Sequence, residues 1–220
     1  LAIPVFDQNG RFNFPCQHPL NLTDMERESL PQADLVLALD VPDLESAVTR
    51  RVQDMGKRAV VNLLPAGAKV INVALDDLLV RAWSHEFNKL RQADLSMLAD
   101  TSVFLPELLR RLREDKAMLA QIAPEIENRR AEWAKIHTKR DDARDAKTKA
   151  NWDNKPIALS RLFTEMNTAL KNEDWVYTNS TRYGAENQYF DFDRHNQMLG
   201  KFKGGGLGYG LPASLGAALA

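Results

Sequence analysis

The sequence contains a single cysteine, Cys16, and no apolar run that approaches the roughly 18–20 residues needed to cross a membrane. One cysteine excludes an intrachain disulfide and is compatible with a reducing cytoplasm. An excess of charge of one sign is also missing, since 29 lysines and arginines stand against 30 aspartates and glutamates. We therefore expect a cytoplasmic protein whose overall charge favours neither nucleic acid nor a membrane surface.

Two common phosphate-binding motifs are absent as well. No Gly-x-x-x-x-Gly-Lys-Ser/Thr sequence occurs, and Leu211 stands where a dinucleotide fingerprint beginning at Gly206 needs its third glycine. The four histidines are spread along the chain without the spacing of zinc ligands: His18, His85, His137 and His195. A zinc centre and the two standard nucleotide loops are therefore not expected.

Three of these scarce residues receive individual expectations. His137 stands in a strongly charged stretch, so we expect it to be solvated on a helix surface. His195 precedes a glycine-rich stretch and is expected to lie in a surface loop. Cys16 stands beside His18, which suggests a reactive thiol, but no third group accompanies the pair, so we expect a buried bystander instead.

The two ends of the chain are apolar. The first residue is Leu1 rather than Met, strand-like residues 2–6 follow at once, and the chain ends in an apolar helical stretch at Ala220. Native termini are usually polar and exposed. We therefore expect an internal fragment of a longer polypeptide.

Residues 1–105 alternate short apolar runs with helical stretches. Continuous apolar runs are typical of parallel strands buried on both faces. The alternation predicts an α/β domain with a parallel sheet, in which ligands bind at the carboxyl ends of the strands. Loop 7–14 is either a wall of such a site or a plain surface connection. The predicted strands are 3–6, 35–39, 59–64, 70–74 and 95–98, and the predicted helices are 24–30, 44–53 and 78–90.

Residues 106–155 differ from the sequence on either side. Apolar residues fall near helical spacing up to Ile126, and Pro124 is expected to bend or break this helix. Residues 125–149 mix both signs of charge, which is typical of a solvated helix between domains. After a polar joint at 151–156, a second α/β domain is predicted, with a helix at 157–170, a strand at 175–177, a polar turn at 178–181 and a helix at 184–192.

Five glycines gather in the nine residues 204–212, and the alanine-rich stretch 213–220 behind them predicts a helix. Glycine is favoured where φ is positive or where a ligand approaches the backbone closely. Pro212 suits the first helical turn, and the N-terminus of a helix favours anions. The stretch is therefore interpreted as a backbone loop beside a ligand, with a packing role as the alternative.

Residues 205–220 read Gly-Gly-Leu-Gly-Tyr-Gly-Leu-Pro-Ala-Ser-Leu-Gly-Ala-Ala-Leu-Ala. This sequence resembles the segment that opens the cofactor pocket in thiamine-diphosphate (ThDP) enzymes, in particular the acetolactate synthase and benzoylformate decarboxylase group. Residues 175–181 are similar to the strand and polar turn that begin the family's diphosphate-binding domain, and residues 33–40 resemble a strand of its central domain.

The resemblance implies that residues 1–105 are part of a parallel-sheet central α/β domain. Residues 106–155 would be a charged helical interdomain linker, and residues 156–220 the start of the ThDP-binding α/β domain. It also implies an enzyme, a lyase or transferase, that acts on a 2-oxo acid by decarboxylation or carboligation as a homodimer or homotetramer.

The same resemblance assigns cofactor-binding residues. Leu207 matches an apolar prop that folds the cofactor, and Gly205 matches the residue whose carbonyl accepts from the cofactor's amino group. Gly206 and Gly208 would let the backbone come close. The polar turn that meets the diphosphate in the family corresponds to Ser180 and Thr181, for which simple helix capping is the alternative.

The family holds Mg²⁺ through a Gly-Asp-Gly…Asn motif and activates the cofactor with a glutamate from an amino-terminal domain. Neither feature occurs in this sequence. No catalytic or metal-binding residue is therefore assigned, and the fragment alone is expected to be inactive. Some members bind FAD, but residues 1–105 contain no glycine phosphate loop that supports it.

Two other functions stay open at this point. One is a non-catalytic module that binds a nucleotide of the FAD or NAD kind, with the glycine stretch as a structural element. The other is an FAD-linked oxidoreductase, which would be yellow. Within the ThDP interpretation, decarboxylase, synthase and lyase activities are all open.

Overall fold

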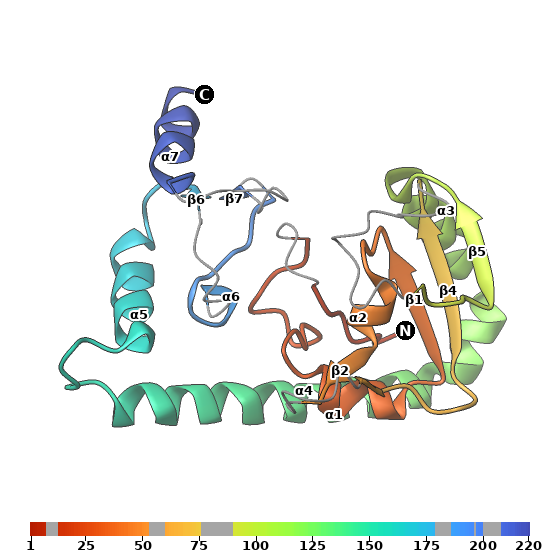
Figure 1. Ribbon diagram of the computed structural model, residues 1–220. Helices are drawn as coiled ribbons and strands as arrows, with labels where there is room; N and C mark the ends of the chain where they lie inside the picture. The colour runs from red at the N-terminus through yellow and green to blue at the C-terminus, as the bar shows by residue number, and fades with distance from the viewer. Residues whose placement is uncertain (8–12, 53–59, 76–89, 179–185, 196, 200–207) are drawn as a thin grey trace. The chain divides into compact units, whose positions relative to one another are not determined.

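The computed structural model describes residues 1–7, 13–52, 60–75, 90–178, 186–195, 197–199 and 208–220. Helices and parallel-strand sheets occur together, which confirms the mixed α/β class (Figure 1). The chain divides into two compact units, one formed by Leu1–Thr23 with Ile126–Ala220 and the other by Asp24–Glu125. The domain boundaries drawn from the sequence stay predictions.

A three-stranded parallel sheet organises the unit Asp24–Glu125. Its strand order is β1 (Leu35–Leu39), β4 (Lys69–Ala74) and β5 (Leu95–Leu98), with Leu37 opposite Ile71 and Val73 opposite Met97. The central strand β4 buries Val70, Val73 and Ala74. Three of the predicted apolar runs therefore become neighbouring parallel strands. The expected burial on both faces holds for β4 but not for β5, where Leu95 is 49% and Leu98 69% exposed.

Two predictions for the first half of the chain are wrong. The helix predicted at 44–53 ends early: α2 covers Leu44–Ala47, and β2 (Thr49–Arg51) then pairs antiparallel with β3 (Val60–Asn62). Pairing with β3 has overridden the helical pattern of residues 49–51. The strand predicted at 3–6 is reduced to one bridge between Val5 and Asn21.

The helices predicted at the start of this unit are partly confirmed. The stretch predicted at 24–30 forms α1 (Glu26–Ser29) followed by the 3₁₀ turn η1 (Leu30–Gln32). The helix predicted at 78–90 falls mainly on residues 76–89, which lie outside the described residues.

The break between the two helices of this region lies at Asp115 and not at Pro124. Helix α3 covers Thr101–Glu114, and α4 runs without a break from Lys116 to Ala150 (Figure 1). The carboxylate of Asp115 accepts from the backbone N–H of Met118 at 2.9 Å, so it caps the start of α4. Pro124 lies inside α4, which corrects the expectation that it would break the helix.

The other unit continues from α4 into α5 (Leu159–Leu170), β6 (Tyr177–Thr178), α6 (Glu186–Tyr189), β7 (Met198–Leu199) and α7 (Gly210–Leu219). Its core contains Cys16, Phe163, Phe190 and Phe192. The helix predicted at 184–192 stops at Tyr189 because Phe190 and Phe192, both essentially without exposure, turn into this core.

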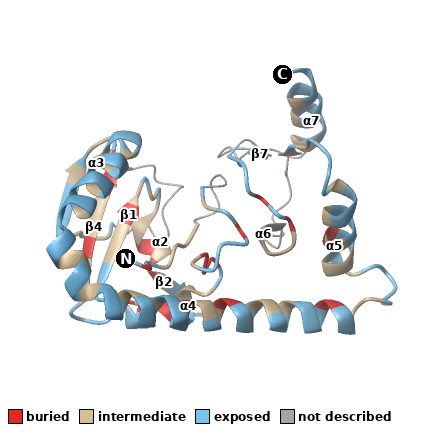
Figure 2. Cartoon of the chain, turned by 180° about the vertical axis from the view of Figure 1, so that it is seen from behind, coloured by how far each residue is buried: buried red, intermediate tan, exposed pale blue. Residues whose placement is uncertain are grey.

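Burial along α4 is uneven. Figure 2 shows isolated buried positions at intervals along the helix, and these are Trp133, His137 and Thr148. Among the helices of the described residues, none combines the length and the apolar character that crossing a bilayer requires.

Candidate functional site

The segments predicted to meet a cofactor follow two short parallel strands. In the sheet of β6 and β7, Tyr177 is opposite Met198 and Thr178 is opposite Leu199. The backbone N–H of Tyr177 also donates to the carbonyl of Gln197 at 2.6 Å. The strands are parallel, so their carboxyl ends lie at one edge, which is where α/β sheets bind ligands. In sequence, β6 leads to Ser180 and Thr181, and β7 leads to the glycine stretch.

The end of the glycine stretch is described from Gly208 onward. Gly208 has φ +91°, in the left-handed region that favours glycine. A Cβ built on it meets no described heavy atom within 4 Å, so among the described residues its backbone has an open side. The positive φ is one of the two reasons for glycine that the sequence suggests, and the approach of a ligand stays a prediction.

Helix α7 begins two residues later, at Gly210. Pro212 lies in its first turn, as predicted, and Tyr209 precedes the helix without a side-chain cap. The first backbone N–H groups of a helix have no partner within the helix and carry the positive end of its dipole. The start of α7 therefore favours a negatively charged group.

A pair of hydroxyl groups connects α7 to β6. Oγ1 of Thr178, the last residue of β6, is hydrogen-bonded to Oγ of Ser214 in α7. The Ser214 hydroxyl also donates to the carbonyl of Gly210 at 2.8 Å. The proton of Ser214 is used on Gly210, so Thr178 is the donor in the pair.

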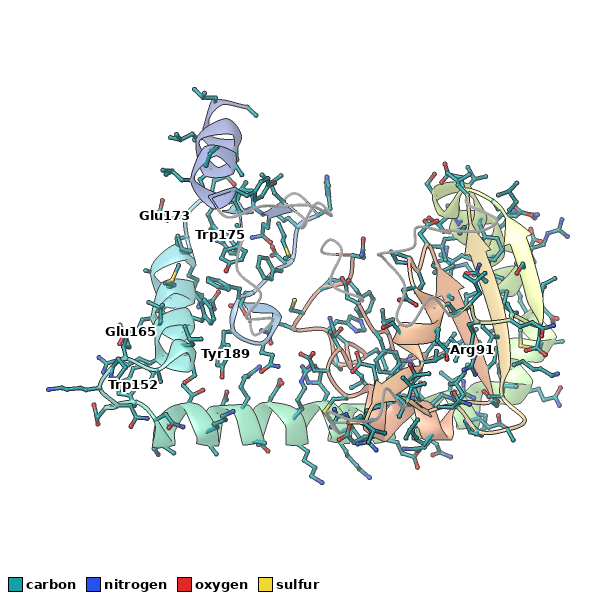
Figure 3. The ribbon with its side chains drawn as sticks, in the orientation of Figure 1. Arg91, Trp152, Glu165, Glu173, Trp175 and Tyr189 are labelled. Atoms are coloured by element: carbon teal, nitrogen blue, oxygen red, sulfur yellow. The ribbon has the colours of Figure 1, made fainter. Side chains whose placement is uncertain are left out.

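An aromatic cluster packs against β6 and the residues that precede it. Phe190 packs against Trp175 and Tyr177 with ring centroids 5.6 Å and 5.3 Å apart, and Phe192 lies 5.4 Å from Trp175. Figure 3 shows Trp175 and Tyr189 beside α5, where Tyr189 contacts Phe163. Rings packed at these distances attract one another, so the aromatic cluster fixes the position of β6.

The turn before β7 is fixed by one buried amide. The side chain of Gln197, 4% exposed, accepts from the backbone N–H groups of Asp193 at 2.8 Å and Arg194 at 2.9 Å. A buried amide oxygen with two donors is satisfied, which stabilises the turn. The entry of the chain into β7 is therefore also held in place.

A second carboxyl edge belongs to the sheet of the other unit. Asp40, which follows β1, has φ +49°, and its Oδ2 accepts from the hydroxyl of Thr101 at 2.5 Å. Asp100, which follows β5, accepts from the backbone N–H of Ser102 at 2.8 Å and caps α3, and this bonding lowers the pKa of Asp100. These polar groups hold the turns after β1 and β5.

A shallow hollow of about 510 Å³ lies along α3 and is lined mainly by apolar atoms of residues such as Val103, Phe104 and Leu108. Glu107, one of its two carboxylates, is bonded to Arg110 and Arg111, which lowers the pKa of Glu107 to about 2. The pKa of the other, Asp100, is also lowered, so neither carboxyl group is a proton donor near neutral pH.

The expectation that His137 is solvated is wrong. His137 is 8% exposed, and its Nε2 lies 3.0 Å from Nη2 of Arg140. Arg140 Nη1 also donates to the carbonyl of Asn21 at 3.0 Å, so the segment before Thr23 covers this face of α4. A chain segment remote in sequence has buried a histidine that stands among charged neighbours.

The exposure expected of His195 and the burial expected of Cys16 are both confirmed. His195 is exposed. Cys16 is 7% exposed, and burial, followed by the charge of Asp7, raises the pKa of its thiol to about 12. Within the described part of the chain, no three histidine, cysteine, aspartate or glutamate side chains gather as a metal site.

Of the predicted cofactor-binding residues, Gly208 is described, with φ +91°, and its role in binding stays a prediction. The others lie outside the described residues: Ser180, Thr181, Gly205, Gly206 and Leu207. The structure also brings together Thr178 and Ser214, which lie beside this edge and which the sequence interpretation did not single out. The available signal was slight, namely a hydroxyl at a strand end and one serine in an alanine-rich helix.

Comparison of the chain with protein-family models, with curated protein sequences and with solved structures finds no match.

Proposed function

We propose that the full-length protein is a ThDP-dependent enzyme that acts on 2-oxo acids by decarboxylation or carboligation. The supporting observation is the edge where β6 and β7 end in parallel and where α7 begins. Two segments that resemble the family's cofactor-binding segments adjoin this edge in sequence, one after Thr178 and one before Gly208. Resemblance and topology thus indicate the same edge.

The described residues fit the proposed cofactor in two respects. The left-handed backbone of Gly208 has an open side, and the uncapped start of α7 favours an anion such as a diphosphate. When bound, ThDP supplies the electron sink for the carbon–carbon bond that breaks. The protein's part is to hold and orient it, with Leu207 as the apolar prop and the carbonyl of Gly205 as the acceptor for its amino group.

Other groups of the mechanism are proposed to come from elsewhere in the full-length protein. These are the glutamate that activates the cofactor and the oxygen ligands that Mg²⁺ prefers, which include carboxylates and the diphosphate itself. We also propose a homodimer or homotetramer. FAD stays an unsupported option.

Calorimetry with ThDP tests the proposal directly. The full-length protein is titrated with ThDP in the presence of Mg²⁺ and again after addition of EDTA, and release of carbon dioxide from pyruvate and from benzoylformate is then assayed. We expect binding that depends on Mg²⁺ and turnover of at least one 2-oxo acid. Failure to bind ThDP in the presence of Mg²⁺ would contradict the proposal.

Leu207→Ala tests the assigned prop. Loss of the side chain is expected to lower kcat at saturating ThDP by about ten-fold or more, because orientation of the reacting groups is a large part of catalysis. Leu215→Ala is the matched control, since Leu215 in α7 is 61% exposed and has no assigned role. Equal kcat values for the two variants would remove Leu207 from the site.

The alternative of a nucleotide-binding module has its own supporting observation. The sheet β1-β4-β5 is parallel, and polar groups of Asp40 and Thr101 meet at its carboxyl edge. Titration of the full-length protein with FAD and with NAD distinguishes the two functions. A yellow protein that binds FAD and ignores ThDP would favour the module or an FAD-linked oxidoreductase.

A further inference from the structure

We propose that Thr178 and Ser214 form a positioning device that holds the start of α7, and with it Gly208, at the carboxyl edge of β6. Neither residue is assigned to contact the cofactor. The proposal deepens the proposed function, on which it rests, because it states how the end of the glycine stretch is kept in place for ThDP.

Thr178 is linked to the chain on both sides of the glycine stretch. Through its backbone it is the register partner of Leu199 in β7, after which the chain enters that stretch. Through its side chain it is bonded to Ser214, which follows the stretch. Thr178 therefore contacts both β7, which precedes the glycine stretch, and α7, which follows it.

The side-chain bond extends into the first residue of α7. Thr178 donates to Ser214, and Ser214 donates to the carbonyl of Gly210. Gly210 is two residues from Gly208, whose φ of +91° marks the turn into the helix. The two hydroxyls thus transmit the position of β6 to the backbone that is proposed to face the cofactor.

Among the described residues, apolar packing contributes little to holding α7. No residue of α7 is buried, and three of its leucines are largely exposed: Leu211 at 73%, Leu215 at 61% and Leu219 at 90%. A helix of ten residues is marginal on its own, so its order depends on tertiary contacts. Among the described residues, the Thr178–Ser214 bond is the side-chain hydrogen bond that joins α7 to the sheet.

The glycines at the start of α7 make the Thr178–Ser214 hydrogen bond important for its order. Gly208 and Gly210, at the start of α7, lose more conformational freedom on ordering than other residues would. If the start of α7 is released, the cost of ordering it again falls on cofactor binding. Loss of the hydroxyl pair should therefore weaken ThDP binding and leave the chemistry of the bound complex unchanged.

The first test measures exchange of the α7 backbone amides with deuterium in the full-length protein without ThDP. Thr178→Val removes the donor but keeps the branched shape that suits a strand, and Thr178→Ser keeps the donor. We expect exchange in α7 to be about three- to ten-fold faster in Thr178→Val, matching loss of one hydrogen bond, and unchanged in Thr178→Ser. Equal exchange in the wild type and Thr178→Val would overturn the proposal.

Ser214→Ala provides a second, independent variant. Alanine favours the helix more than serine does, so local propensity alone predicts slower exchange in α7. The proposal predicts faster exchange, because the bond to β6 is lost. In the double variant with Thr178→Val, the effects should not add, since both substitutions remove the same bond. Additive effects would mean that the two hydroxyls act separately, which contradicts the proposal.

The second test measures ThDP affinity and turnover in the presence of Mg²⁺. We expect Thr178→Val and Ser214→Ala to raise the Kd for ThDP about three- to ten-fold, with kcat at saturating ThDP within about two-fold of wild type and Thr178→Ser restoring the Kd. Faster exchange with an unchanged Kd would refute the role in cofactor binding. If the wild type binds no ThDP, the proposed function fails, and the exchange experiment still decides whether the pair holds α7.

Discussion

Nε2 of His137 lies 3.0 Å from Nη2 of Arg140, one turn apart on α4. A guanidinium can only donate, so this ring nitrogen is unprotonated and accepts the bond. The other ring nitrogen, Nδ1, then carries the proton and lies 3.4 Å from Oδ2 of Asp141. The folded protein thus holds His137 in its neutral form.

This relationship predicts loss of stability in mild acid. Burial and the charge of Arg140 lower the pKa of His137 below its ordinary value of 6.5, against the opposing effect of Asp141, while Arg144 and His18 add to the lowering. The unfolded chain therefore takes up the proton first. The contribution of His137 to the free energy of unfolding should be constant above about pH 6.5. It should fall as the pH drops from there toward the lowered pKa.

Urea unfolding at about pH 7.5 and at about pH 5.5 measures the effect. In His137→Gln the side chain stays uncharged, so the loss of stability between the two pH values should be smaller than in the wild type. His195→Gln, which changes an exposed histidine, should keep the wild-type loss. An equal loss in wild type and His137→Gln would show that His137 is not the group responsible.

Arg140→Ala tests the importance of the bonds around this histidine. Arg140 donates to the carbonyls of Asn21 and Thr23, and its side chain is only 16% exposed. Bonds that involve a charged partner contribute more than neutral ones, so we expect a loss of about 2–3 kcal/mol in the free energy of unfolding. The control is Arg130→Ala on the same helix, whose side chain is 57% exposed and whose removal should change stability by less than about 0.5 kcal/mol. Similar losses for both variants would contradict the special role of Arg140.

The thiol of Cys16 should be inert in the folded protein. Its pKa of about 12 leaves almost no thiolate at pH 8, and the thiolate is the form that reacts. Iodoacetamide is therefore expected to leave the native protein unmodified over a time in which it labels the urea-unfolded chain at one position. Rapid labelling of the native protein would show that Cys16 is accessible and its thiolate available.

The strands predicted best from the sequence are those that a local run of apolar residues marks. Leu35–Leu39 is a continuous apolar run and Leu95–Leu98 is apolar except for Ser96, and both form strands with the predicted bounds. Thr49–Arg51 is polar and forms a strand by pairing with Val60–Asn62. The apolar run predicts the partner strand, but no local pattern shows that the two segments pair. Propensity is a weak guide where pairing partners decide the outcome.

The same contrast applies to single residues. His137 stands among charged residues, and its neighbour Arg140 donates to the carbonyl of Asn21, 119 positions away in the chain. No local signal could predict this. The conformation of Gly208, in contrast, was predictable, because a cluster of glycines before a helix is itself a signal for positive φ.

The last prediction uses this contrast between two glycines that are eight positions apart. At both Gly208 and Gly216, an added Cβ meets no described heavy atom within 4 Å, so space does not distinguish them. Backbone conformation does, because Gly208 has φ +91° whereas Gly216 lies inside α7. Alanine should therefore destabilise the protein at Gly208 by about 1–2 kcal/mol and stabilise it at Gly216 by about 0.4–1 kcal/mol.

Urea unfolding of Gly208→Ala and Gly216→Ala checks the opposite signs, and ThDP titration of the same variants connects them to the proposed function. Alanine at position 208 changes the backbone that is proposed to face the cofactor, so the Kd should rise by about ten-fold, a difference of about 1.4 kcal/mol. Alanine at position 216 should leave the Kd unchanged, since it only favours the helix. If both substitutions stabilise the protein, Gly208 does not need its left-handed conformation, and the argument that this turn is built for a ligand loses its basis.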